Sequence, residues 1–329
     1  MNLSYCQTPA FLSKSLHLLS CISIPIHLFG VYIILCKTPE PMRTVKWSMF
    51  NLHVWSVLLD LSISLLTSPF VLFPALAGFP LGFLKELDVS TGAQIYLVVT
   101  VFAVVGVAVL GIFENRFYVM FALDSFWRYF RFPFFLFNHF IAVLFFVPPY
   151  LSIPNQNMAL DQIFQDLAPD LPEWIKIGPI FVLTTDIAYS FVSILLIAVF
   201  IIAEILFFIF LIWLNMQFLT KTMSLSKATL RLQRKFLNAI HIQLYTPLVA
   251  LIIPLLYFAY SVYFDSYNQA YNNISFIIIS CHGLISTLIM LFIHKPYREI
   301  CRSIFCGFRG HKTSPAARSR GLSIAPNQL

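Results

Sequence analysis

The chain has 329 residues, of which 59% are hydrophobic and only 11% are charged, and its mean hydropathy is +0.82. Because soluble domains carry about 25% charged residues, this composition excludes a soluble globular enzyme. Long uncharged runs and 35 phenylalanines indicate that lipid surrounds most of the chain, since about 20 apolar residues form a helix that crosses about 30 Å of hydrocarbon.

Seven apolar stretches bounded by charged or turn-forming residues predict seven transmembrane helices. In chain order they cover 15–36, 47–76, 93–122, 132–153, 179–217, 237–263 and 272–294. Prolines 25, 69, 74, 247 and 254 fall within these spans, where each is expected to kink its helix. The connection 154–178, with its prolines and acids, predicts an irregular loop with room for one amphipathic turn. Neither an internal repeat nor a pair of broken helices is visible.

An odd number of spans places the two termini on opposite sides of the membrane, and the basic residues give the direction. Only three of the 21 basic residues, at positions 14, 85 and 176, fall on the side of the N-terminus. The others fall after spans 1, 3, 5 and 7, at Lys37, Arg43 and Lys46, at Arg116, Arg128 and Arg131, in the segment Lys221–Lys235, and in the tail after 294. The N-terminus is therefore expected outside and the C-terminus inside. The net charge of +7 then faces anionic lipid headgroups, and nucleic-acid binding is not expected.

A short amphipathic helix is expected after the last span. Apolar residues recur at 297, 300, 301, 304, 305 and 308, with charged residues opposite them, as in a helix that lies on the inner leaflet. The stretch that follows this helix, up to Leu329, has too few apolar residues to fold. We therefore expect one seven-helix domain over 1–308, which includes this juxtamembrane helix, and a disordered cytoplasmic tail over 309–329.

The sequence also offers candidate modification sites. Asn2 and Asn273 begin glycosylation sequons on the side expected to be extracellular. Cys301 and Cys306 lie where S-acylation occurs in membrane proteins, although both could equally be small apolar residues that face lipid. Only Cys6 is clearly outside, so no extracellular disulfide is expected within the chain.

Two acids fall near the middle of spans, where charge is costly: Asp60 in span 2 and Glu204 in span 5. One interpretation makes each a polar switch or ion site inside the bundle. The other makes each a protonated acid that is hydrogen-bonded to a neighbouring helix. At the inner end of span 3, Glu114-Asn115-Arg116 allows an acid–base pair within the triplet, or a reach of Arg116 into the bundle.

Several motifs together resemble the nematode serpentine chemoreceptors of class h (Srh), with class i as the nearest alternative. They are Thr38-Pro39-Glu40-Pro41-Met42, Val45-Lys46-Trp47, Asn51-Leu52-His53-Val54-Trp55-Ser56, Leu59-Asp60-Leu61, Pro74, Gly78, Gly82, Glu114-Asn115-Arg116 and His294-Lys295-Pro296-Tyr297-Arg298. The resemblance implies an all-α seven-transmembrane G-protein-coupled receptor. It implies a chemosensory role in the plasma membrane, at the cilia of sensory neurons, with a small-molecule ligand and a heterotrimeric G protein as partners.

The resemblance also indicates which residues carry function. G-protein coupling would fall to Glu114, Asn115 and Arg116 with Arg231, Arg234 and Lys235. Ligand binding would use polar and aromatic residues in the outer halves of the spans, namely Gln94, Tyr96, Thr184, Asp186, Tyr257, Tyr260 and Tyr271. Their surroundings suit a small apolar or amphiphilic molecule. No cofactor, metal or catalytic residue is expected, because the histidines lack metal-ligand spacing. A multi-pass transporter or channel is the alternative function, and a membrane enzyme is a more remote one.

The charge distribution predicts the topology directly. An epitope tag before Met1 should bind antibody on intact cells, whereas a tag after Leu329 should bind only after permeabilisation. The reverse pattern, or binding at both ends of intact cells, would contradict the assignment.

Overall fold

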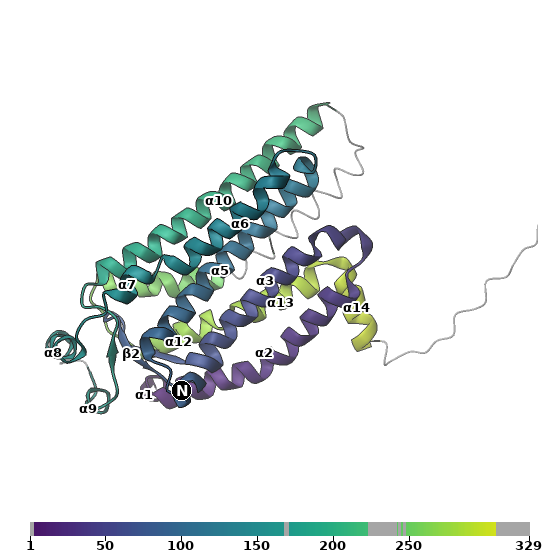
Figure 1. The fold of residues 1–329 in the computed structure, drawn as a ribbon. Coiled ribbons are helices and arrows are strands. Elements are labelled where there is room, and N and C mark those ends of the chain that lie inside the picture. Colours follow the sequence, from purple (N-terminus) through teal and green to yellow (C-terminus); the bar gives the residue numbers. More distant parts are fainter. Residues whose placement is uncertain (1–2, 168–170, 223–241, 243–244, 246–247, 307–329) are drawn as a thin grey trace, which may run out of the picture.

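The computed structural model describes residues 3–167, 171–222, 242, 245 and 248–306, and they form a bundle of long helices with a small sheet at one end (Figure 1). The helices of the bundle are α2 (Pro9–Lys37), α3 (Arg43–Leu61), α5 (Thr91–Phe117), α6 (Trp127–Leu144), α10 (Ile187–Thr222), Leu248–Tyr263, α12 (Gln269–Ile279) and α13 (His282–Ile293). Two π-helices, η2 (Ser62–Thr67) and η3 (Tyr118–Ala122), extend α3 and α5.

The smaller elements gather at the two ends of the bundle. They are α1 (Leu3–Cys6), the 3-10 helix η1 (Glu40–Met42), β1 (Pro69–Val71), β2 (Ala77–Pro80), α4 (Phe83–Glu86), α7 (Val147–Leu151), α8 (Gln156–Leu167), α9 (Glu173–Lys176), β3 (Phe181–Val182) and α14 (Lys295–Cys306). We call the end with the three strands the sheet end, and the opposite end, with η1 and α14, the α14 end. The N-terminal helix α1 lies at the sheet end (Figure 1).

The predicted seven-helix membrane bundle is confirmed. Among the described residues, six helices are long and apolar enough to cross a bilayer: Pro9–Lys37, Arg43–Thr67, Thr91–Ala122, Trp127–Leu151, Ala188–Phe218 and Gln269–Ile293. The shorter apolar helix Leu248–Tyr263 falls where span 6 was expected, and the first part of that span lies outside the described residues. The largest hydrophobic core joins α3 and α5 with faces of α2, α10 and α13, through residues such as Leu59, Leu110 and Phe208.

The spanning helices begin at ordinary caps. The Thr8 hydroxyl accepts a hydrogen bond from the Phe11 amide, and Pro9 takes the first position of α2, where no amide hydrogen is needed. Ser90 accepts from the amide of Ala93 at the start of α5. The 36 residues of α10 make it the longest helix among those described.

Span 2 is shorter than the sequence predicted. The prediction carried the helix to residue 76, but the helix ends at Thr67 and Ser68 turns into the left-handed region with φ 42°. The backbone of a residue before proline avoids the helical region, so Pro69 ends the helix instead of kinking it. Pro74 likewise lies outside the helix, between β1 and β2.

The three strands form one antiparallel sheet in the order β1, β2, β3. Phe70 of β1 pairs with Phe79 of β2, and Gly78 of β2 pairs with Phe181 of β3. The sheet thereby joins the connection after span 2 to the connection before span 5. It also corrects the predicted start of span 5, because β3 occupies part of 179–217 and α10 begins only at Ile187.

The connection 154–178 is more ordered than predicted, since it contains the three-turn helix α8 and the single turn α9. Ile163 of α8 and Ile175 of α9 pack with Val182 of β3 and Leu12 of α2 in a second hydrophobic core. This core explains the order, because the connection buries apolar side chains of its own against the sheet.

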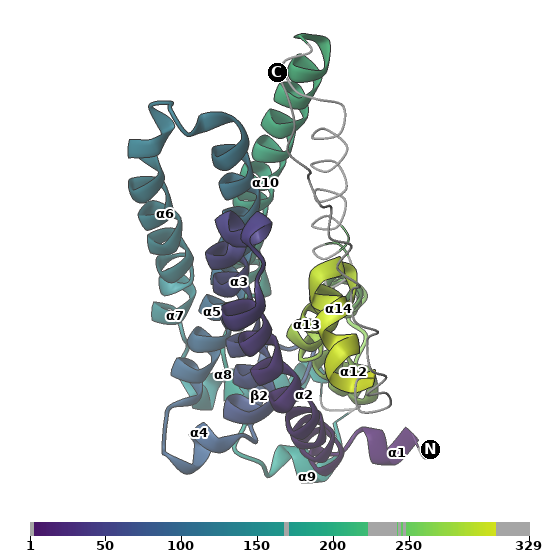
Figure 2. The ribbon, with the colours of Figure 1, turned by 90° about the vertical axis from the view of Figure 1, so that its right-hand side faces the viewer.

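Span 7 is interrupted, which the sequence analysis did not anticipate. Helix α12 ends at Ile279 and α13 begins at His282, with Ser280 and Cys281 in a turn between them. The amphipathic helix expected after span 7 is present as α14, viewed across the bundle in Figure 2. The buried Tyr297 of α14 shares a 2.8 Å hydrogen bond with Thr38 after α2. The predicted tail 309–329 lies outside the described residues.

Candidate functional site

Asp60 is completely buried on α3 and holds the start of α13. Its Oδ1 accepts the amide hydrogen of Gly283 at 2.9 Å, and its Oδ2 accepts that of Leu284 at 2.8 Å. The first amides of a helix have no partner within the helix, so a carboxylate there satisfies them and complements the helix dipole. Asp60 therefore caps the N-terminus of α13 from a different helix, in place of the N-cap residue Cys281, whose side chain makes no such bond.

A polar network surrounds this cap and ties three helices together. His27 Nε2 of α2 lies 3.4 Å from Asp60 Oδ2, and His27 Nδ1 lies 3.1 Å from the Thr287 hydroxyl of α13. His53 Nε2 of α3 lies 3.1 Å from the carbonyl oxygen of His27. A Cβ at Gly283 would lie 2.7 Å from Asp60 Oδ2, so only glycine permits this approach.

Glu204, the second intramembrane acid, is not part of that network. It lies on α10, where Asn138 Nδ2 of α6 donates to its Oε1 at 3.5 Å. Asn138 is buried, whereas Glu204 is partly exposed. The structure thus places the two acids on different helix interfaces, each beside polar partners on neighbouring helices.

At the α14 end, Glu114 of α5 is fully buried and receives three hydrogen bonds from α6. Arg131 donates to both carboxylate oxygens, from Nε at 2.7 Å and from Nη2 at 2.8 Å, and Trp127 Nε1 donates at 2.7 Å. This two-point pairing of guanidinium with carboxylate is the strongest ordinary ion pair. The guanidinium also stacks on the Tyr118 ring, 3.9 Å from its centroid.

Asn115 connects the same pair to α3. Its Oδ1 accepts from Arg131 Nη2 at 3.2 Å, and its Nδ2 donates to the carbonyl oxygen of Thr44 at 3.1 Å. Arg116 is partly buried one residue before the end of α5. The remaining predicted coupling residues, Arg231, Arg234 and Lys235, lie outside the described residues.

Arg131 is the residue that the sequence analysis missed. It was counted as a loop residue because span 4 was expected to begin at 132, whereas α6 begins at Trp127. Trp127 and Arg131 are four residues apart and therefore share a helix face. This aromatic–arginine spacing, soon after an acid at the end of span 3, was the signal available in the sequence.

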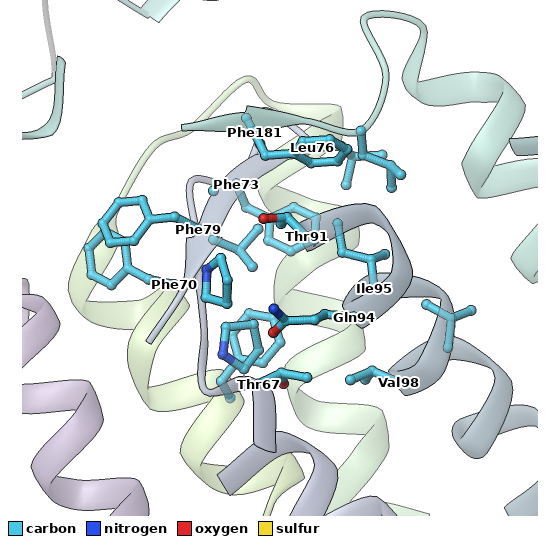
Figure 3. A pocket seen from close by; sticks show the side chains of 18 of the residues that line it. Thr67, Phe70, Phe73, Leu76, Phe79, Thr91, Gln94, Ile95, Val98 and Phe181 are labelled. Carbon is cyan, nitrogen blue, oxygen red and sulfur yellow. The ribbon is translucent and has the colours of Figure 1, made fainter. Parts of the chain in front are cut away.

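The sheet end contains a partly enclosed, mainly apolar cavity of about 210 Å³ between the sheet, α5, α10 and α12 (Figure 3). It is lined by Thr67, Pro69, Phe70, Val71, Phe73, Leu76, Ala77, Gly78, Phe79, Pro80, Thr91, Gln94, Ile95, Val98, Val99, Phe146, Phe181, Leu183, Ser190, Ile194 and Phe276. No lining residue is charged. Pockets of this kind, apolar with a few polar groups, are typical of small-molecule sites.

Of the seven residues predicted to bind ligand, Gln94 lines this cavity. Tyr96 turns toward the α6–α7 region, where its hydroxyl donates to the carbonyl oxygen of Val143. Thr184 and Asp186 form a turn before α10, in which the Thr184 hydroxyl donates to the Asp186 carbonyl oxygen at 2.9 Å.

The three predicted tyrosines near span 7 also lie outside the cavity lining. Tyr257 donates to the carbonyl oxygen of Asn268 and to Asn272 Oδ1, each at 3.1 Å. Tyr260 and Tyr271 are 52% and 53% exposed. Helix rotation decides these outcomes, and the sequence alone did not fix it.

The structure corrects two of the predicted modification sites. Asn273 is 1% exposed and its Nδ2, the atom that a glycan would use, donates to the Cys6 carbonyl oxygen at 2.8 Å. Cys301 is buried against the main core, and burial raises the pKa of its thiol, which disfavours the thiolate that reacts. Asn2 and the side chain of Cys306 lie outside the described residues. Within those residues, no cluster of three metal-ligating side chains occurs.

Comparison with known proteins gives a consistent result. The model of the family described as "Serpentine type 7TM GPCR chemoreceptor Srh" matches residues 7–307. Serpentine receptor class H-72 of Caenorhabditis elegans is 28% identical over 300 residues, which cover 86% of this chain and 82% of that receptor.

The Asp60 cap predicts a stability effect. Asp60→Asn keeps one acceptor oxygen but turns an amide NH₂ toward a buried backbone amide, so it should lower the free energy of unfolding by about 1–3 kcal/mol. Asp186→Asn is the matched control, because Asp186 Oδ1 accepts from the Ala188 amide at an exposed helix start where asparagine caps equally well. Thermal unfolding of the purified chains measures both, and an equal effect of the two substitutions would contradict the role of Asp60.

The Glu114–Arg131 pair predicts a second effect. Arg131→Ala leaves a buried carboxylate without its cation and should cost about 3–5 kcal/mol of stability, whereas adding Glu114→Gln should recover part of the loss. Arg43→Ala is the control, because the Arg43–Glu40 pair is exposed and should contribute less than about 1 kcal/mol. Thermal unfolding of the single and double variants tests the coupling, and strictly additive losses would refute it.

Proposed function

Because the chain belongs to the Srh family of serpentine seven-transmembrane chemoreceptors, we propose that it binds a small molecule in the cavity at the sheet end and activates a heterotrimeric G protein at the α14 end. The family match over residues 7–307 carries this proposal. By the same family relationship, the receptor works in the plasma membrane, at the cilia of sensory neurons.

The charge distribution supports the orientation that this function needs. Placing the sheet end outside leaves the basic residues Lys37, Arg43 and Lys46, together with Arg128 and those of α14, on the cytoplasmic side. Positive charge near span ends is retained there. In this orientation the cavity lies on the outer side of the membrane, where external ligands arrive. Arg116 lies at the cytoplasmic end of α5.

The cavity supports the ligand site because it lies among elements from several spans. The helices α5, α10 and α12 all contribute lining residues, and the sheet covers the cavity from the outside. A ligand that packs between α5 and α10 changes the contacts between these two helices. Since α5 also carries Glu114, Asn115 and Arg116, the ligand site and the coupling residues share one rigid element.

The α14 end supports G-protein coupling through its charge. Arg116 lies at the end of α5, and the segment Lys221–Lys235, which begins in the last turn of α10, adds five basic residues. A helix of the G protein inserted beside α5 would be held by apolar packing, with Arg116 and this segment orienting it and speeding the encounter. Arg131 holds Glu114 and Asn115, which anchors the first two residues of the triplet. We assign the contact with the G protein to Arg116 because it lies at the end of α5.

Nucleotide exchange on a G protein by the reconstituted chain tests the proposal. Exchange above the rate of empty vesicles supports it, and no exchange with any G-protein class contradicts it, as would be expected of a transporter or channel. Arg116→Ala should reduce exchange at least tenfold. Arg128→Ala, which removes an exposed charge at the same end, should change exchange less than about twofold. Equal effects would remove Arg116 from the coupling site.

The basic segment is tested in the same assay. Reversal of charge at Arg231 and Arg234 should slow exchange at low ionic strength and have less effect as salt is added, because screening weakens steering over distances of about 10 Å. No effect at low salt would make the basic segment a topology determinant only.

A further inference from the structure

Two residues that line the cavity each have a buried polar atom without a hydrogen-bond partner in the described structure. The atoms are Gln94 Oε1 on α5 and Ser190 Oγ on α10, whose residues are 2% and 1% exposed. Leaving such an atom unpaired destabilises the folded state, so buried polar groups are nearly always paired. Both residues line the same apolar cavity, and Figure 3 shows Gln94 pointing into it.

The orientation of Gln94 is fixed by its other contact. Its Nε2 donates to the carbonyl oxygen of Val89 at 2.8 Å. Flipping the amide would place Oε1 against that carbonyl, two acceptors facing each other, so the amide nitrogen must point to Val89. The oxygen is then left toward the cavity, where it needs a donor.

The Ser190 hydroxyl supplies a hydrogen-bond donor that complements the acceptor oxygen of Gln94. A serine hydroxyl in a helix often donates to the carbonyl four residues earlier, which here is that of Asp186. That carbonyl already accepts from the Thr184 hydroxyl at 2.9 Å, and Ser190 makes no such bond. The Ser190 hydroxyl can therefore donate to a ligand oxygen. By contrast, Thr67, another polar lining residue, donates to the Ser62 carbonyl oxygen at 2.7 Å.

The rest of the lining limits the charge and size of the ligand. No acid or base lines the cavity, so an ionic ligand would lose its hydration without gaining a counter-charge. An apolar cavity of about 150 Å³ holds benzene, which has six non-hydrogen atoms. By proportion, about 210 Å³ suits about eight such atoms.

We infer that the receptor's ligands are small, uncharged, mainly hydrocarbon alcohols, whose hydroxyl donates to Gln94 and accepts from Ser190. This inference rests on the proposed function, since it specifies the chemistry of the same cavity. It does not require that the G protein be identified, because binding is measured on the receptor alone.

Four probes of about eight non-hydrogen atoms separate the possibilities: benzyl alcohol, anisole, ethylbenzene and protonated benzylamine. Anisole has an acceptor but no donor, and ethylbenzene has neither. Binding is measured by ligand-observed NMR on the purified full chain in nanodiscs, with empty nanodiscs subtracting the probe that dissolves in lipid. Thermal unfolding establishes that each variant is folded.

The inference predicts a pattern across variants. Ser190→Ala should lower the affinity for benzyl alcohol and for anisole about fivefold. Gln94→Leu should lower the affinity for benzyl alcohol about fivefold and leave the affinity for anisole unchanged. Neither variant should lower the affinity for ethylbenzene. The wild-type chain should bind benzylamine at least tenfold more weakly than benzyl alcohol. Ser193→Ala, on the same helix with its hydroxyl bonded to the Tyr189 carbonyl oxygen, should change nothing.

Three results would overturn the inference: equal losses for ethylbenzene and benzyl alcohol, tight binding of benzylamine, or no binding of benzyl alcohol to the wild-type chain. Gln94→Leu also removes the donor to Val89, so if that variant fails to fold, the Ser190→Ala and Ser193→Ala pair decides the outcome alone. Failure of nucleotide exchange with normal alcohol binding would contradict the proposed function and leave the ligand class standing.

Discussion

The interaction on which most of the bundle depends is the capping of α13 by Asp60. A helix that begins inside hydrocarbon exposes amide hydrogens that water cannot reach, and each one left unpaired is costly. The break at Ser280 and Cys281 creates this situation in span 7, and the Asp60 carboxylate resolves it with two hydrogen bonds. Because the carboxylate belongs to α3, the solution also fixes α3 against α13, and His27 brings α2 into the same arrangement.

Both ends of the bundle combine directional contacts with apolar packing. At the α14 end, Arg131 pairs with Glu114, Asn115 donates to the backbone of Thr44, and Tyr297 bonds with Thr38. At the sheet end, Gln269 and Asn272 of α12 donate to the carbonyl oxygens of Val71 and Phe73, and the Phe70 ring packs near that of Phe79. Directional contacts select one geometry, whereas apolar packing adapts to shape. The lining of the cavity is mostly of the second kind.

The sequence was sufficient for the fold class, because composition and the lengths of apolar runs reflect the bilayer directly. It also located the amphipathic α14 and the acid–base triplet at the end of α5. It was less informative where an apolar stretch can form either a helix or a strand. The apolar run to residue 76 contains a helix end, a turn and a strand, and the change follows Ser68, directly before Pro69. Side-chain partners were out of reach, since Arg131 and Asp60 find theirs on other helices, through rotations that one chain's periodicity does not specify.

The motif that prompted the family resemblance has a physical basis in these contacts. Thr38 bonds with Tyr297 of α14, and Asp60 accepts from the Gly283 amide of α13. Lys46 Nζ donates to the Leu35 carbonyl oxygen near the end of α2. Residues of these short motifs therefore make contacts between parts of the chain that are far apart in the sequence.

The length of α10 has a mechanical consequence. From Ser190 at the cavity to Thr222 the helix is about 48 Å long at 1.5 Å per residue, well beyond the thickness of the hydrocarbon layer. Treated as a rigid rod that pivots near Ser190, it displaces its far end by about 4 Å for a tilt of about 5°. If the cavity binds a ligand as proposed, a sub-ångström adjustment around that ligand would be magnified into a movement the size of a side chain at the far end of α10.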